Sequence, residues 1–160
     1  MSETKTQLNI FVLEDDPNAI GVAGFLEARG HKVWRAEELA SAVYRFEYDP
    51  GIDHFDCLLF DLSLPARTVR HRGDRGTVSY GDVILTGLDF IIQNHSFYLR
   101  EPIEKNALAI LTAFSLQTAN TLAANPEYQR ILRTVPVIKK TDDDFLEGIE
   151  KFLANVVKSL

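Results

Sequence analysis

The sequence has very little cysteine, no excess of basic residues and no long apolar run, and each absence excludes a class of protein. The single cysteine, Cys57, excludes an internal disulfide and a cysteine-rich zinc site. There are 17 basic and 23 acidic side chains, giving a formal net charge of −6, whereas a general nucleic-acid binder normally has a basic excess. No apolar run approaches the ~20 residues of a membrane span, and no signal-peptide pattern opens the chain. We therefore expect a cytoplasmic protein without a membrane segment and without direct nucleic-acid binding.

What is present is typical of a globular protein. The chain has 160 residues, of which 46 % are apolar and 25 % are charged. This size suits one compact domain, and neither a linker nor a second domain is visible in the sequence. We expect residues 1–160 to form a single domain with no output domain after the last helix.

Short apolar runs alternate with segments of helical periodicity. A continuous apolar run such as Cys57-Leu58-Leu59-Phe60 is typical of a strand that is buried on both faces of a parallel sheet. The alternation therefore favours an α/β domain with helices on both faces of the sheet. The predicted strands are 8–13, 32–35, 57–60, 107–111 and 135–138; the predicted helices begin near 17, 39, 88 and 115, the last interrupted at 125–126, and a final helix covers 145–160.

Polar residues follow four of these strands. Glu14-Asp15-Asp16 ends the first, Asp61 the third, Thr112 the fourth and Lys139-Lys140 the fifth. In an open parallel sheet, functional groups gather beyond the carboxyl ends of the strands. An acidic cluster, a hydroxyl and an ammonium group should therefore converge on one edge. An alternative for the first cluster is simple capping of the helix that follows it.

These groups have a definite chemistry. Carboxylates that are held close together repel one another, and Mg²⁺, which prefers oxygen ligands, relieves that repulsion. A carboxylate such as Asp61 can attack phosphorus and become an aspartyl phosphate. A lysine then supplies positive charge, and the hydroxyl of Thr112 can donate to the phosphoryl oxygens.

In this order, the motifs resemble those of the receiver domain of response regulators in two-component signal transduction. The resemblance implies a flavodoxin-like, three-layer α/β/α fold, with a doubly wound five-stranded parallel sheet of order 2-1-3-4-5. The segments that carry the resemblance are Val12-Leu13-Glu14-Asp15-Asp16-Pro17, Phe55 to Pro65, Gly87-Leu88-Asp89-Phe90, Ala109 to Ala113 and Val137-Ile138-Lys139.

The resemblance also implies a role for individual residues. Asp61 matches the phospho-acceptor, Thr112 the switch hydroxyl and Lys139 the lysine that binds the phosphoryl group. For Mg²⁺, the implied ligands are Asp15, Asp61, the backbone carbonyl of Ser63 and, through water, Glu14; Asp16 is a third acid that a one-residue shift would bring into the site.

The sequence departs from the family pattern in three places. Lys140 stands where the family usually has a proline, and Pro136 stands where an aromatic residue is common. We expect one of the two adjacent lysines to point into the site. The segment 66–86 replaces what is normally a very short loop, and Gly73 and Gly76 within it predict a hairpin. This inserted loop is predicted to cover the site or to contact a partner.

The leading hypothesis is a stand-alone receiver, which is not a metabolic enzyme. A histidine kinase or phosphotransfer protein would donate the phosphoryl group to Asp61, and the signal would pass to a downstream protein target or through a homodimer. A second hypothesis is a degenerate receiver that works as an interaction module without phosphorylation. A third is an unrelated flavodoxin-like enzyme or flavin binder, which the acidic segment after the first strand disfavours because it would repel a phosphate.

Overall fold

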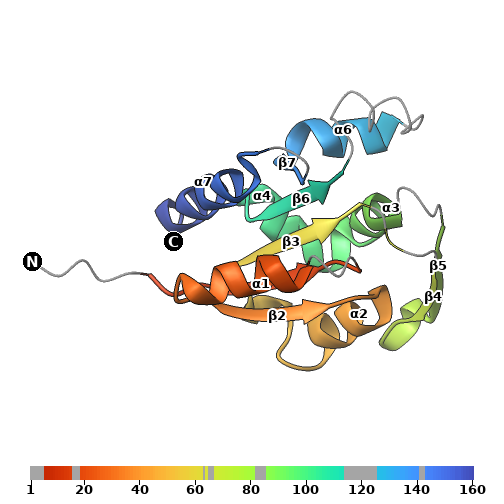
Figure 1. Cartoon of the computed structure of the whole chain (residues 1–160). Helices are drawn as coiled ribbons and strands as arrows, with labels where there is room; N and C mark the ends of the chain where they lie inside the picture. Colours follow the sequence, from red (N-terminus) through yellow and green to blue (C-terminus); the bar gives the residue numbers. More distant parts are fainter. Residues whose placement is uncertain are drawn as a thin grey trace, which may run out of the picture.

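Five parallel strands form the central sheet of the protein (Figure 1). The structure, a computed structural model, describes residues 6–15, 19–62, 64, 67–81, 86–113, 126–140 and 143–160. The strand order β2-β1-β3-β6-β7 is the predicted order 2-1-3-4-5. The strands are β1 (Asn9–Leu13), β2 (Lys32–Ala36), β3 (Cys57–Asp61), β6 (Leu108–Thr112) and β7 (Val137–Lys139).

Helices cover both faces of this sheet, so the predicted three-layer α/β/α architecture is confirmed (Figure 1). Helices α1 (Ala19–Ala28) and α7 (Phe145–Lys158) lie on one face. The other face is covered by α2 (Leu39–Glu47), α3 (Thr86–Gln93), α4 (Arg100–Glu104) and α6 (Pro126–Thr134). Short helical segments η1 (Ile52–His54) and η3 (His95–Leu99) precede β3 and α4.

Alternate residues of each central strand enter opposite cores. In β3, Leu58 and Phe60 pack with α2 and α3, whereas Cys57 and Leu59 pack with α1 and α7. This follows from the two-residue period of a strand, and it explains why all five residues of β3 are buried. The sequence of β3 therefore does not alternate between apolar and polar residues, because helices cover both faces of the strand.

The end of β3 lies unusually close to the start of α3. The N–H of Gly87 donates to the carbonyl oxygen of Leu62 at 3.0 Å. A Cβ atom at residue 87 would lie only 2.0 Å from the backbone carbonyl oxygen of Asp61. Only glycine permits this approach, which fixes α3 against the strand that ends in Asp61.

The predicted hairpin is present as a separate two-stranded antiparallel sheet. Strands β4 (Arg67–Arg70) and β5 (Thr77–Tyr80) are joined through the turn η2 (Gly73–Arg75). Gly73 and Gly76 have φ angles of +74° and +62°, which L-residues with a side chain rarely adopt. The hairpin lies at the end of the molecule toward which the strands of the main sheet point (Figure 1).

A buried polar network holds the hairpin against α2 and η3. The side chain of His71 is fully buried, and its Nδ1 lies 3.2 Å from Arg75 Nη1 and 2.9 Å from the Tyr98 hydroxyl. Because a guanidinium group can only donate, Nδ1 is the acceptor, and Nε2 donates to the Tyr80 hydroxyl at 2.5 Å. The carboxylate of Glu47 lies 3.6 Å from Nδ1. The network therefore requires a neutral imidazole.

From residue 95 onward, the described structure differs from the sequence expectation in two places. Strand β7 begins at Val137, not at Val135, because the N–H of Val135 still donates to Ile131 in α6 and Pro136 has no N–H. The predicted helix from 115 lies mostly outside the described residues; its second part is α6. The chain from 95 to 104, for which no element was predicted, forms η3 and α4. None of the described helices is both long enough and apolar enough to span a membrane.

Replacing Gly87 by alanine should destabilise the protein strongly, because the new Cβ would overlap the Asp61 carbonyl. We expect the free energy of unfolding, measured by urea denaturation, to fall by about 3 kcal/mol. Gly24→Ala is the matched control: residue 24 lies inside α1 with open space around it, so the substitution should stabilise by about 0.5–1 kcal/mol. A stable Gly87→Ala variant would contradict the close approach of α3 to β3.

Acidification should weaken the attachment of the hairpin. Burial lowers the pKa of His71 below its ordinary value of 6.5, and the charge of Arg75 lowers it further, although Glu47 partly opposes both. Because the pKa of His71 is lower in the folded state than in the unfolded state, its contribution to stability is fully present above the unfolded pKa. This contribution is lost progressively as the pH falls from the unfolded pKa through the folded pKa.

We therefore expect unfolding stability to drop between about pH 7.5 and about pH 5.5, and to drop less in His71→Gln, which cannot be protonated. Urea denaturation at both pH values, with hydrogen exchange at the hairpin amides, measures this. Equal losses in the two proteins would show that His71 does not carry the effect.

Candidate functional site

Two buried carboxylates lie at adjacent strand ends. Glu14 directly follows β1, and Asp61 is the last residue of β3. The two strands pair in parallel with Leu13 opposite Phe60, so the two acids occupy equivalent positions beyond that pair. Their exposed fractions are 1 % and 3 %. Burial of two neighbouring carboxylates is unfavourable unless a cation accompanies them.

The ammonium group of Lys140 provides that cation. Its Nζ contacts Glu14 Oε1 and lies 3.2 Å from Asp61 Oδ2, and only 16 % of the lysine side chain is exposed. Burial alone would lower the pKa of Lys140. The hydrogen bond to Glu14 and the negative charges of Asp61 and Glu14 outweigh it, so the pKa is raised and the ammonium stays charged.

The fourth central strand brings a hydroxyl to the same edge. Thr112 is the last residue of β6, is fully buried, and pairs in register with Lys139. Its carbonyl oxygen accepts a hydrogen bond from the N–H of Lys140 at 2.7 Å. This bond fixes the backbone from which the lysine side chain extends. At the carboxyl ends of β1, β3 and β7, Lys140 contacts both Glu14 and Asp61, and Thr112 ends the neighbouring strand β6.

The lysine that contacts Asp61 is one residue later than the resemblance implied. Of the adjacent pair, one was expected to point inward, and the structure places the ammonium group of Lys140 on Asp61. The resemblance had assigned the phosphoryl contact to Lys139, the last residue of β7. Lys140 directly follows β7, and the hydrogen bond from its N–H to Thr112 holds the backbone from which its side chain reaches Asp61.

The remaining predicted ligands are only partly in view. Asp15 follows Glu14 after the end of β1, and its side chain is exposed. Asp16 and Ser63 lie outside the described residues. Within the described ranges, no three His, Cys, Asp or Glu side chains form a group that could hold a metal ion. Asp15 and Asp61 nevertheless supply the hard oxygen donors that Mg²⁺ prefers, and Mg²⁺ needs only one or two protein carboxylates. The donor set therefore fits Mg²⁺.

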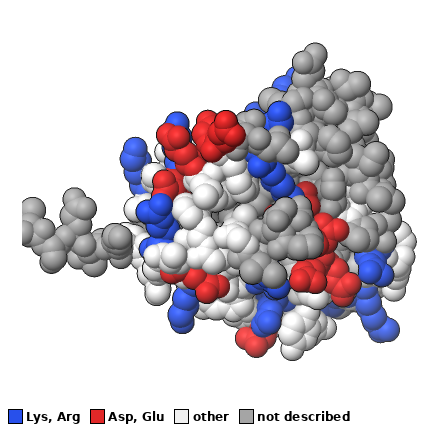
Figure 2. All heavy atoms as spheres, in the orientation of Figure 1, with Lys and Arg blue, Asp and Glu red and all other residues white. Residues whose placement is uncertain are grey.

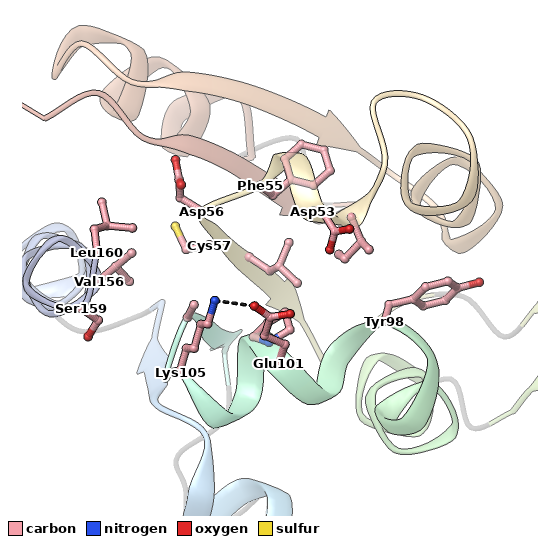
Figure 3. A pocket seen from close by; sticks show the side chains of 14 residues that line it. Asp53, Phe55, Asp56, Cys57, Tyr98, Glu101, Lys105, Val156, Ser159 and Leu160 are labelled. Atoms are coloured by element: carbon pink, nitrogen blue, oxygen red, sulfur yellow. Dashed lines mark hydrogen bonds and ion pairs between the residues drawn. The ribbon is translucent and has the colours of Figure 1, made fainter.

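A separate pocket of about 550 Å³ lies at the opposite end of the sheet (Figure 3). It is lined by Cys57, the first residue of β3, by Asp56 and by the ion-paired Glu101 and Lys105 of the α4 region. Four residues of strand, ~13 Å, separate Cys57 from Asp61. Burial raises the pKa of the Cys57 thiol, as does the charge of Asp56, so the thiol is unreactive. This pocket does not belong to the site.

Solved receiver domains have the same fold as this chain. The receiver domain protein of Methanospirillum hungatei JF-1 is 20 % identical, with a TM-score of 0.60 over 97 % of this chain and 100 % of that one. The receiver domain of the sensor histidine kinase PA1611 of Pseudomonas aeruginosa PAO1, whose structure has a magnesium ion in the active-site cleft, is 17 % identical, with a TM-score of 0.58 over 95 % and 99 %.

The chemotaxis protein CheY4 of Vibrio cholerae is 15 % identical, with a TM-score of 0.59 over 94 % of this chain and 99 % of that one. No protein-family model and no curated protein matches the sequence. At these identities the likeness establishes the fold. The resemblance to receiver domains is thus confirmed at the level of architecture.

Removal of the Lys140 charge should destabilise the protein, because the buried carboxylates of Glu14 and Asp61 would lose the ammonium group that contacts both. We expect Lys140→Met to lower the free energy of unfolding by about 3 kcal/mol. Added Mg²⁺ should restore more stability to this variant than to the unsubstituted protein.

Lys151→Met is the matched control, since Lys151 pairs with Glu147 on the exposed surface of α7 and should contribute less than about 1 kcal/mol. Urea denaturation of the three proteins, with and without Mg²⁺, tests both statements. Equal stability of Lys140→Met and Lys151→Met would show that the ion pairs of Lys140 do not stabilise the buried carboxylates of Glu14 and Asp61.

Proposed function

We propose that this chain is a response-regulator receiver domain that accepts a phosphoryl group on Asp61 and signals through protein–protein contact. The observation that carries the proposal is the placement of the Lys140 ammonium between the buried acids Glu14 and Asp61, at the carboxyl edge of a receiver fold. A site that only stabilised the fold would have no need of two buried carboxylates, which are costly to bury. Such a site is suited to binding a charged ligand, such as a cation that pairs with the carboxylates or a phosphoryl group that pairs with the ammonium group.

In the proposed reaction a carboxylate oxygen of Asp61 attacks the phosphorus atom of a phosphohistidine. The P–N bond breaks as the new P–O bond forms, and the departing imidazole takes a proton. Hydrolysis later transfers the phosphoryl group to water and regenerates the carboxylate. Such transfers depend on positioning and on neutralisation of charge more than on acid–base catalysis.

The residues around Asp61 have distinct tasks in this reaction. The Nζ of Lys140 already contacts Oδ2, so it can pair with the phosphoryl oxygens without a large movement. We assign the phosphoryl contact that the resemblance gave to Lys139 to Lys140 on this ground. The hydroxyl of Thr112, at the end of the neighbouring strand β6, is the donor that would respond to the new phosphoryl group.

Mg²⁺ is the proposed cofactor. Asp15, Asp61 and the carbonyl of Ser63 are the proposed direct ligands, with Glu14 acting through water and Asp16 as a further acid. When bound, the ion supplies positive charge to the phosphoryl oxygens. The PA1611 receiver domain, which has Mg²⁺ in its cleft, supports this assignment.

The proposed role is signalling and not metabolism. The phosphoryl donor would be a histidine kinase or a phosphotransfer protein, and the phosphorylated chain would pass the signal to a downstream protein or to a second copy of itself. A phosphorylation-independent module is the second candidate, because Pro136 replaces the aromatic residue that commonly switches in the family and no proline follows Lys139. In that case the buried acids would serve only to bind a cation.

The test is intact-mass spectrometry after incubation with acetyl phosphate and Mg²⁺. We expect one phosphoryl adduct, which is absent from Asp61→Asn and from an EDTA-treated sample. Lys140→Ala should slow adduct formation by at least about tenfold, because it removes a charge that stabilises the transferring group. Lys151→Ala, which removes an exposed lysine of α7, is the matched control and should react at nearly the unsubstituted rate.

Two outcomes would count against the proposal. An adduct that persists in Asp61→Asn would place the acceptor elsewhere. The absence of any adduct, together with calorimetry that detects no Mg²⁺ binding, would favour the phosphorylation-independent module.

A further inference from the structure

Exposed aromatic rings gather beside the hairpin. Tyr44, Tyr48 and Phe97 have exposed fractions of 55 %, 58 % and 57 %. Among the described residues, they are three of the five large apolar side chains that are exposed. A cluster of such side chains marks an interaction surface more often than single exposed ones do.

Two arginines of the hairpin turn lie against these rings. Tyr44 and Tyr48 stack with their centroids 5.5 Å apart, and the guanidinium group of Arg72 lies 5.5 Å from the Tyr48 ring. The guanidinium group of Arg75 lies 3.6 Å from the Phe97 ring. These five residues are called the arginine–aromatic surface below. A shallow hollow of about 490 Å³ is lined by both arginines, Phe97 and Glu47, and the Glu47 carboxylate is already paired with the backbone N–H of Arg72.

Hydrogen bonds to Glu47 and Asn94 hold the two arginines of the arginine–aromatic surface in place. The backbone N–H of Arg72 lies 2.9 Å from both carboxylate oxygens of Glu47, and its Nη1 donates to the Glu47 carbonyl at 3.0 Å. Arg75 Nη1 donates to Asn94 Oδ1 at 2.8 Å, and Asn94 is fully buried. The rings and guanidinium groups are thus positioned before any partner arrives, which reduces the ordering cost of binding.

The charge of the hairpin is opposite to that of the whole chain. Residues 67–75 carry four arginines and one acid, Asp74, a formal charge of 4 − 1 = +3 in a protein of −6. Arg67 pairs with Glu38 at 3.5 Å. Within the part of the chain that the structure describes, Arg70 and Arg75 pair with no carboxylate. The hairpin therefore has cationic groups available to an acidic ligand.

We propose that the arginine–aromatic surface binds an acidic, aromatic-containing segment of a partner protein. Carboxylates of the segment would accept from the guanidinium N–H groups at the rim, and one of its aromatic side chains would enter the hollow beside Phe97. Arginine and tyrosine are the residue types that dominate binding energy at protein interfaces. None of its five residues is among those proposed to hold Mg²⁺ or the phosphoryl group, so its binding does not require phosphorylation.

A nucleic acid is the rival class of ligand, and the charge distribution disfavours it. A phosphate backbone needs a run of basic contacts. On the face drawn in Figure 2, acidic and basic side chains are interspersed and no broad basic area is present. A short acidic peptide needs only the few contacts that the hairpin offers.

The test uses a fluorescein-labelled random copolymer of glutamate and tyrosine, titrated with the full chain and followed by anisotropy. Saturable binding is expected, with backbone NMR shifts at residues 44, 48, 72, 75 and 97. The double variant Tyr48→Ala/Phe97→Ala removes two exposed rings and should weaken binding at least about tenfold. The matched control Leu146→Ala removes an exposed apolar side chain of α7 and should bind as the unsubstituted protein does.

Three results would overturn the proposal: no binding of the copolymer, equal affinity of the double variant, or tighter binding of a lysine–tyrosine copolymer or of single-stranded oligo-dT. Asp61→Asn should bind the glutamate–tyrosine copolymer with unchanged affinity. Failure of phosphorylation at Asp61 would consequently leave this binding intact, so the two proposals fail separately.

Discussion

The ion pairs of Lys140 with Glu14 and Asp61 are the interaction on which the rest of the site depends. Two carboxylates can share a buried strand edge only if a cation neutralises them, and here that cation comes from the end of β7. Its position is fixed in turn by the backbone bond from Lys140 to Thr112. One ammonium group thus connects the ends of three strands, and any ligand of Asp61 must compete with it or replace it.

The sheet and the identity of the site could be predicted because both follow from local pattern. Five short apolar runs separated by helical segments define a parallel sheet, and the residue after each run defines its functional edge. Asp61 could be identified without knowledge of distant contacts, since it directly follows the continuous apolar run 57–60. The glycines of the hairpin turn were informative for the same reason.

The choice between Lys139 and Lys140, in contrast, could not be made from the sequence. It depends on where β7 begins, and that depends on how far α6 extends before Pro136. A shift of one residue reverses the direction of every side chain in a strand. The polar network around His71 was missed for a different reason. Its partners Glu47, Tyr80 and Tyr98 are far apart in the sequence and have no spacing that suggests a cluster.

The bond between Gly87 and Leu62 has a consequence for how this fold tolerates change. The chain departs from the sheet after Leu62 and is back beside the same residue at Gly87, where the N–H and the carbonyl oxygen are 3.0 Å apart. The hydrogen bond therefore brings together the two ends of the segment between Leu62 and Gly87. The entropic cost of closing such a loop grows only slowly with its length. The length of this segment therefore does not affect the register of the five central strands. The hairpin is nevertheless part of the same structure, because its residues Val69 and Tyr80 pack in the core that α2 and α3 share with the sheet.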